Sequence, residues 1–217
     1  MKSRLNRIYQ RLHVFFGPQY WWPAEGPFEV MVGAILTQNT SWSNVEKAIR
    51  NLKDKKALSP IRLSKMPVEE LAKLIRPAGY YNIKARRLKN FLKFIFGSYQ
   101  GNIRKMSLEG IQGLRARLLS VNGIGPETAD SIILYALNKP VFVVDAYTKR
   151  ILLRHGLAKE DYDYEQLQDI FMRGLTPKVK LFNEYHALLV KLGKEFCHKN
   201  KPKCLACPLG SLSTNKN

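Results

Sequence analysis

The chain has 217 residues, 45% of them hydrophobic and 11% aromatic, which excludes a largely disordered protein and allows one large or two small domains. Its 36 lysines and arginines against 17 aspartates and glutamates give a net charge of +19. No apolar run is long enough to span a bilayer, and no apolar signal segment follows the N-terminus. We therefore expect a soluble cytoplasmic protein with no membrane partner.

Helical spacing of apolar residues covers most of the chain. After a first amphipathic helix near the N-terminus, the pattern predicts helices over residues 28–36, 68–75, 84–96 and 107–119. The last of these carries Leu108 on its apolar face. Only residues 141–144 look extended, and four residues make no sheet. The sequence therefore predicts an all-α fold.

The positive charge recurs along the whole chain and is not confined to a tail. A protein with this charge and a pI near 10.0 most simply has a polyanion as its partner, and nucleic acid is the first candidate. The alternative is a solvated surface that happens to be rich in lysine. Charge alone does not identify a reaction.

A helical hairpin is predicted over residues 114–137. One helix ends near Ser120, Gly123-Ile124-Gly125 forms a tight turn, and Pro126 opens a second helix at the position that proline favours. Ile124 can pack inward while neighbouring N–H groups point outward toward a backbone phosphate. A Gly-x-Gly turn also occurs in purely structural hairpins, but its combination here with Val121, Thr128 and Ala129 favours a DNA-binding role.

The hairpin is one of five segments that together resemble the helix-hairpin-helix DNA glycosylases of the endonuclease III superfamily. The other four are residues 36–40, 79–85, 143–147 and 186–197, all in the expected order. The resemblance implies two helical domains flanking a DNA-binding cleft. A six-helix barrel-like domain would cover 28–138, and residues 1–27 plus 139–217 would form the second domain. It also implies a partner, double-stranded DNA containing a damaged base. We expect a nucleoid-associated protein and, as the default for one that wraps a single flipped nucleotide, a monomer.

Asp145 matches the catalytic aspartate of that family. Cleavage of an N-glycosidic bond builds positive charge on the sugar, which a carboxylate can stabilise while it orients or deprotonates an attacking water. An aspartate that follows an extended run and precedes a helix is also a good N-cap. The resemblance implies that Asp145 does both.

Glu127 stands where relatives that also cut the DNA backbone carry a lysine. That lysine forms a Schiff base with the sugar, which a carboxylate cannot do. The resemblance therefore implies a monofunctional glycosylase that uses water. A first-turn glutamate is also favourable for the helix dipole, so Glu127 has a structural interpretation as well.

Aromatic residues cluster ahead of the second predicted helix and again near residue 42. Trp21, Pro23 and Trp42 match the aromatic and proline pocket of the 3-methyladenine DNA glycosylase branch. Indole faces would stack on a flipped base and attract a cationic alkylated purine. Each tryptophan could equally belong to the core. The resemblance implies excision of alkylated purines such as 3-methyladenine.

Gln38 and Tyr80 match the positions at which relatives enter the duplex. One would fill the gap left by the flipped nucleotide, and the other would wedge the opposite strand. The structural alternatives are a hydrogen-bonding glutamine at a helix end and an exposed tyrosine after a turn.

Three cysteines, Cys197, Cys204 and Cys207, have the spacing of the family's iron–sulfur loop, but its fourth cysteine is replaced by Ser213. A four-iron, four-sulfur (4Fe-4S) cluster could persist with Ser213 or water on the fourth iron. A three-iron or absent cluster and a zinc site including His198 are the alternatives. In relatives the cluster fixes a basic loop against phosphates, which here corresponds to Lys199, Lys201 and Lys203.

Two other functions remain open from the sequence. The chain could excise mismatched thymine or adenine, or an oxidised base, as other branches of the superfamily do. It could also be a DNA-binding hairpin protein without catalytic activity, although that interpretation leaves Asp145 and the aromatic cluster unexplained.

Overall fold

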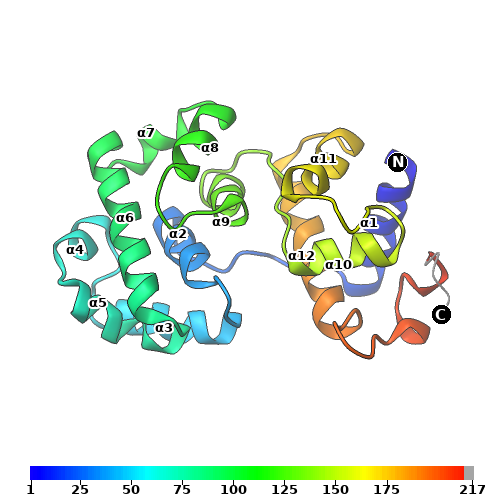
Figure 1. Ribbon diagram of the computed structural model, residues 1–217, viewed down its shortest axis with the longest axis horizontal. Coiled ribbons are helices and arrows are strands. Elements are labelled where there is room, and N and C mark those ends of the chain that lie inside the picture. The colour runs from blue at the N-terminus through cyan, green and yellow to red at the C-terminus, as the bar shows by residue number, and fades with distance from the viewer. Residues whose placement is uncertain (213–217) are drawn as a thin grey trace. The chain divides into compact units, whose positions relative to one another are not determined.

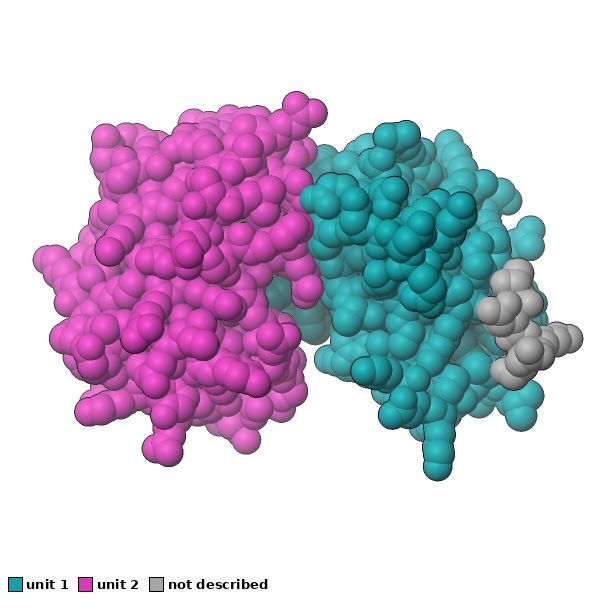
Figure 2. All heavy atoms as spheres, in the orientation of Figure 1, with its two compact units in different colours: residues 1–23, 140–217 teal, residues 24–139 magenta. Residues whose placement is uncertain are grey.

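The computed structural model describes residues 1–212, which are helical and contain no strand. The chain divides into two compact units (Figures 1 and 2). Unit 1 comprises Met1–Pro23 and the described part of Pro140–Asn217, and unit 2 comprises Ala24–Lys139. Among the described residues, no helix combines the length and the apolar character that crossing a membrane requires.

Unit 2 is built around helix α2, which is apolar on nearly all sides and is therefore buried on nearly all sides. Helices α3, α6 and α9 and the π-helical turn η2 pack against it. The helices of this unit are α2 (Pro27–Leu36), α3 (Trp42–Asp54), α4 (Pro60–Lys65), α5 (Val68–Leu74), α6 (Tyr81–Tyr99), α7 (Ile103–Ser107), α8 (Ile111–Leu119) and α9 (Pro126–Ser131), with short turns η1 (Arg76–Ala78) and η2 (Ile132–Ala136).

Unit 1 contains α1 (Lys2–Phe16), α10 (Ala146–Arg154), α11 (Tyr164–Gly174) and α12 (Val179–Glu195), followed by η3 (Cys204–Ala206) and η4 (Gly210–Leu212). Its core is aromatic: Phe142 stacks on Phe171 with ring centroids 3.7 Å apart, and Tyr185 meets both rings edge-on. The Tyr185 hydroxyl donates a hydrogen bond of 2.9 Å to the Leu5 carbonyl, which ties α12 to α1.

The helix predicted over residues 107–119 is wrong at its N-terminal end. Helix α7 ends at Ser107, α8 begins only at Ile111, and Leu108 is 80% exposed. Gly110, in extended conformation, caps α8. The helical spacing of apolar residues continues across this break, so a prediction from spacing alone merges two separate helices into one. Helix α6, in contrast, is longer than predicted because it runs through Gly97, beside which there is open space.

Candidate active site and DNA-binding loops

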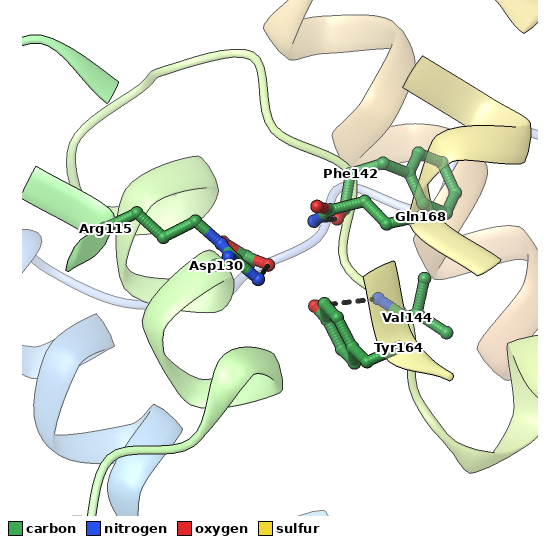
Figure 3. A network of polar contacts seen from close by, with 6 residues as sticks. All are labelled: Arg115, Asp130, Phe142, Val144, Tyr164 and Gln168. Atoms are coloured by element: carbon green, nitrogen blue, oxygen red, sulfur yellow. Dashed lines mark hydrogen bonds and ion pairs between the residues drawn. The ribbon is translucent and has the colours of Figure 1, made fainter. Parts of the chain in front are cut away.

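The extended segment 141–144 holds Asp145 in place although it belongs to no sheet. Its side chains are buried, and its backbone bonds to side chains of α11 (Figure 3). Gln168 Nε2 donates to the Phe142 carbonyl at 2.6 Å, and the Val144 N–H donates to the Tyr164 hydroxyl at 3.3 Å. These bonds replace the ladder that a neighbouring strand would supply.

Asp145 is the N-cap of α10, so this structural part of the prediction is confirmed. Its Oδ1 accepts a hydrogen bond of 2.7 Å from the Thr148 N–H. Its Oδ2 lies 3.8 Å from Nε2 of His186 on α12, and the carboxylate side chain is only 13% exposed. Burial lowers the pKa of His186, and the nearby carboxylate opposes that shift. The carboxylate therefore faces an imidazole whose neutral form is favoured by burial.

The hairpin has the conformation that its sequence predicts. Gly123 has φ of +94°, Gly125 is exposed at the start of α9, and Ile124 packs inward with 5% exposure. Sequence reasoning missed a buried ion pair between its two helices: Arg115 binds Asp130 through two hydrogen bonds of 2.8 and 3.2 Å (Figure 3). Asp130 is fully buried, so this pair fixes how the helices meet.

Glu127 lies exposed in the first turn of α9. It belongs to unit 2, whereas Asp145 belongs to unit 1. The aromatic residues are divided in the same way. Trp21 and Trp22 lie in unit 1 with ring centroids 5.5 Å apart, followed by the exposed Pro23.

Trp42 begins α3 in unit 2, is half-buried, and donates from Nε1 to Glu46 at 2.7 Å. Trp21 is likewise half-buried. Both indoles are therefore partly accessible, which a residue fully within a core would not be.

The side chain of Gln38 lies against the hairpin. Its Nε2 donates to the Gly123 carbonyl at 3.0 Å and to Thr128 Oγ1 at 2.9 Å, and its Oε1 accepts a hydrogen bond from Arg87 of α6. The hydrogen-bonding alternative that the sequence left open therefore describes Gln38 in this structure. Nothing in the local sequence pointed to Arg87.

A buried lysine connects two segments that lie far apart in the sequence. Lys84 on α6 is 1% exposed, and its Nζ donates to the carbonyls of Leu36 at 2.8 Å and Ala78 at 2.7 Å. These carbonyls precede the loops that carry Gln38 and Tyr80. Burial, together with the neighbouring Arg87 charge, lowers the pKa of Lys84 to about 8. Tyr80 itself is 69% exposed with φ of +45°.

The cysteine loop is organised by arginines from α10. Arg154 donates to Cys197 Sγ at 3.2 Å and to the His198 carbonyl at 2.6 Å, and Arg150 donates to the Cys197 carbonyl at 2.7 Å. The Leu209 N–H points at Cys207 Sγ from 3.4 Å. Two of the three sulfur atoms therefore face N–H donors: the Arg154 guanidinium at Cys197 and the Leu209 backbone N–H at Cys207.

Burial raises the pKa of the Cys207 thiol, and the nearby Cys197 and Cys204 raise it further. Within residues 1–212, no group of three or more histidine, cysteine, aspartate or glutamate side chains could hold a metal ion. Ser213 lies outside the described residues. The three predicted phosphate-binding lysines of the loop, Lys199, Lys201 and Lys203, are all exposed.

This helical architecture, with its glycine-turn hairpin and an aspartate capping the helix that follows, defines the class of helix-hairpin-helix DNA glycosylase folds. The family description "HhH-GPD superfamily base excision DNA repair protein" matches residues 32–177. The chain belongs to this superfamily, as the sequence predicted.

Individual relatives cover nearly the whole chain. It is 49% identical over 214 residues to a protein of Methanocaldococcus jannaschii that carries the provisional name DNA repair glycosylase MJ1434, covering 98% of this chain and 96% of the relative. The structure of H. pylori 3-methyladenine DNA glycosylase bound to 1,N6-ethenoadenine superposes with a TM-score of 0.76 at 29% identity, covering 89% of this chain and 96% of that one.

A non-covalent endonuclease III–DNA complex superposes with a TM-score of 0.84 at 22% identity, covering 99% of this chain and 95% of that chain. At this level of identity the likeness shows the shared fold.

Proposed function

We propose that this protein is a monofunctional DNA glycosylase that hydrolyses the N-glycosidic bond of alkylated purines such as 3-methyladenine. The observation that carries the proposal is the placement of Asp145. Its carboxylate is fixed by a cap bond on one oxygen and by the buried His186 near the other. A negative charge held in this way, with little solvent around it, is suited to stabilising a cationic sugar.

The reaction needs one water molecule and no covalent intermediate with the protein. As the bond between sugar and base breaks, positive charge develops on the sugar, and Asp145 stabilises it. The same carboxylate orients the water and accepts its proton as the new C–O bond forms. The products are the free base and an abasic site in an intact strand.

The absence of strand cleavage is inferred from Glu127. This exposed carboxylate stands at the start of α9, where an amine would be needed to form an imine with the sugar. We therefore expect no covalent protein–DNA adduct on treatment with borohydride. Efficient trapping would overturn the monofunctional assignment and require another lysine as nucleophile.

The choice of alkylated purines is supported by the half-buried Trp21 and Trp42, the exposed Pro23 and the likeness to the 3-methyladenine enzyme. An alkylated purine already carries positive charge, so it leaves readily and gains from contact with indole faces, by about 0.5–2 kcal/mol each. Mismatched thymine or adenine is the second candidate. It would require recognition of the opposite base, for which the exposed Asn39 and Tyr80 are the available side chains.

The chemistry of the cysteine loop supports an iron–sulfur cluster, although residues 1–212 contain no preformed group of three metal ligands. Three thiols lie in one loop, and two receive N–H hydrogen bonds of the kind that surround cluster sulfurs. Cys197, Cys204 and Cys207 would hold a 4Fe-4S cluster, with Ser213 or water as the fourth ligand. When bound, the cluster would supply a structural cross-link for the loop that presents Lys199, Lys201 and Lys203 to DNA phosphates.

The central test uses duplex DNA treated with a methylating agent, with chromatography of the released bases. The wild-type protein should release 3-methyladenine and leave strands intact until alkali is added. Asp145→Asn should abolish release and retain DNA binding, because asparagine is as good an N-cap as aspartate and preserves α10.

A matched control is Asp163→Asn. Asp163 caps α11 through a 2.8 Å bond from the Gln166 N–H, in the same way as Asp145 caps α10. This variant should excise at the wild-type rate. Equal loss of activity in both variants would mean that Asp145 acts only as a cap, and no base release by the wild type would direct the search to mismatched or oxidised substrates.

A further inference from the structure

The amide of Gln38 has no N–H donor left for DNA, and its oxygen already accepts one hydrogen bond. Both hydrogens of Nε2 are donated, to the Gly123 carbonyl and to Thr128 Oγ1, and Oε1 accepts from Arg87. All three partners lie in unit 2 together with Gln38. Insertion of this side chain into a duplex would therefore break three hydrogen bonds at once.

The side chain of Arg87 packs directly against the hairpin turn. A Cβ atom added to Gly123 would lie 2.3 Å from Arg87 Cγ, so the aliphatic part of this arginine rests directly on the glycine. Gly123 has φ of +94°, a conformation that other residues rarely adopt. The turn, the arginine and Gln38 thus pack together. Gln38 acts as a strut, meaning that its hydrogen bonds hold loop 37–40 against the hairpin.

Asn39, the next residue, is exposed and does not share the hydrogen bonds of Gln38. Asn39 is exposed and lies in the left-handed region with φ of +53°, which turns it away from the preceding residue. Across residues 1–212 its side chain makes no hydrogen bond. Asparagine tolerates this backbone better than most residues and carries both a donor and an acceptor at its tip.

We propose that Asn39, and not Gln38, is the side chain that this loop presents to the DNA bases, while Gln38 remains bound to the hairpin. The proposal rests on the DNA glycosylase function proposed above and adds a specificity-determining residue to it. The Asn39 amide can donate to and accept from a base edge exposed when the damaged nucleotide is flipped, including that of the base left unpaired in the opposite strand.

Binding to a duplex that contains a stable abasic-site analogue, followed by fluorescence anisotropy, tests this directly. Asn39→Gly keeps the left-handed backbone and removes the amide, so we expect about tenfold weaker binding. The dependence on salt should be unchanged, because no charge is removed. Asn138→Gly is the matched control: Asn138 is also exposed with φ of +52°, and binding should stay at the wild-type level.

A second variant tests whether Gln38 stays bound to the hairpin or enters the duplex, because the two cases change DNA affinity in opposite directions. Thr128→Val keeps the volume of a buried side chain and removes one bond to Gln38. If Gln38 is a strut, the loop loosens and DNA binding weakens about threefold. If Gln38 must leave its place to enter the duplex, the same variant binds DNA more tightly.

Wild-type affinity in Asn39→Gly, or tighter binding in Thr128→Val, would overturn the proposal. Base release from methylated DNA is measured in parallel. Weaker binding by Asn39→Gly without any base release by the wild type would refute the proposed glycosylase activity and leave Asn39 as a DNA contact. A wild-type protein that does not bind the duplex would refute both.

Discussion

The buried Lys84 should make the free energy of unfolding of this protein rise with pH between about pH 8 and 10.5. Its pKa is about 8 in the folded chain, against an ordinary value of 10.5 that applies once the chain unfolds. Below pH 8 the ammonium is charged in both states. Between pH 8 and 10.5 the unfolded chain retains a proton that the folded chain has lost, so unfolding becomes less favourable as pH rises.

The size of the effect follows from that difference in pKa. The free energy of unfolding should gain at most about 3 kcal/mol across this range. Both hydrogen bonds survive, because a neutral amine still has two N–H groups for the carbonyls of Leu36 and Ala78. Nothing that anchors the two loops is therefore lost on deprotonation.

Urea denaturation of the wild type and of Lys84→Met at pH 7, 8, 9 and 10 measures this effect. Other lysines and tyrosines titrate in both proteins and cancel in the difference. The wild type should become progressively more stable than the variant above pH 8. A difference that is independent of pH would refute the lowered pKa, and one that shrinks with pH would mean that the two carbonyls favour the charged ammonium more than burial opposes it.

Four further variants are compared with the wild type by denaturation. Gly123→Ala should cost about 1–3 kcal/mol, because it forces a side chain into a left-handed position against Arg87, whereas Gly125→Ala, in open space, should cost much less. Phe142→Ala should cost about 3–5 kcal/mol by emptying the aromatic core, and a smaller loss would mean that the site collapses. Because burial lowers the pKa of His186, acid protonates this residue mainly in the unfolded chain. The wild type should therefore lose more stability than His186→Gln between pH 6.5 and 5. Parallel plots of unfolding free energy against pH for the two proteins would contradict this.

The features that were predictable from sequence are local ones. The turn at Gly123 and the helix opened by Pro126 follow from the backbone preferences of glycine and proline, which need no distant partner. The cap formed by Asp145 depends only on the Thr148 N–H three residues later. The family pattern added the order of these segments and their chemical meaning.

The features that sequence did not reveal depend on distant residues. Arg87 meets Gln38 across 49 positions, and Lys84 reaches Leu36 across 48. A lysine inside an amphipathic pattern is normally expected at the surface, so only the fold shows that Lys84 is buried. The exposure of Leu108 shows the converse error, in which regular apolar spacing hides a helix end.

The division of the chain also determines the order in which its parts can fold during synthesis. Unit 2 is continuous, whereas unit 1 is built from Met1–Pro23 and a segment that begins at Pro140. Helix α1 is synthesised before the whole of unit 2, but it packs on α11 and α12, which are synthesised after unit 2. At about 5–20 residues per second, Leu5, Ile8 and Leu12 wait roughly ten to thirty seconds for their partners. The apolar face of α1 must therefore stay unburied while the whole of unit 2 is synthesised. Unit 1 can fold only after α11 and α12 have also been made.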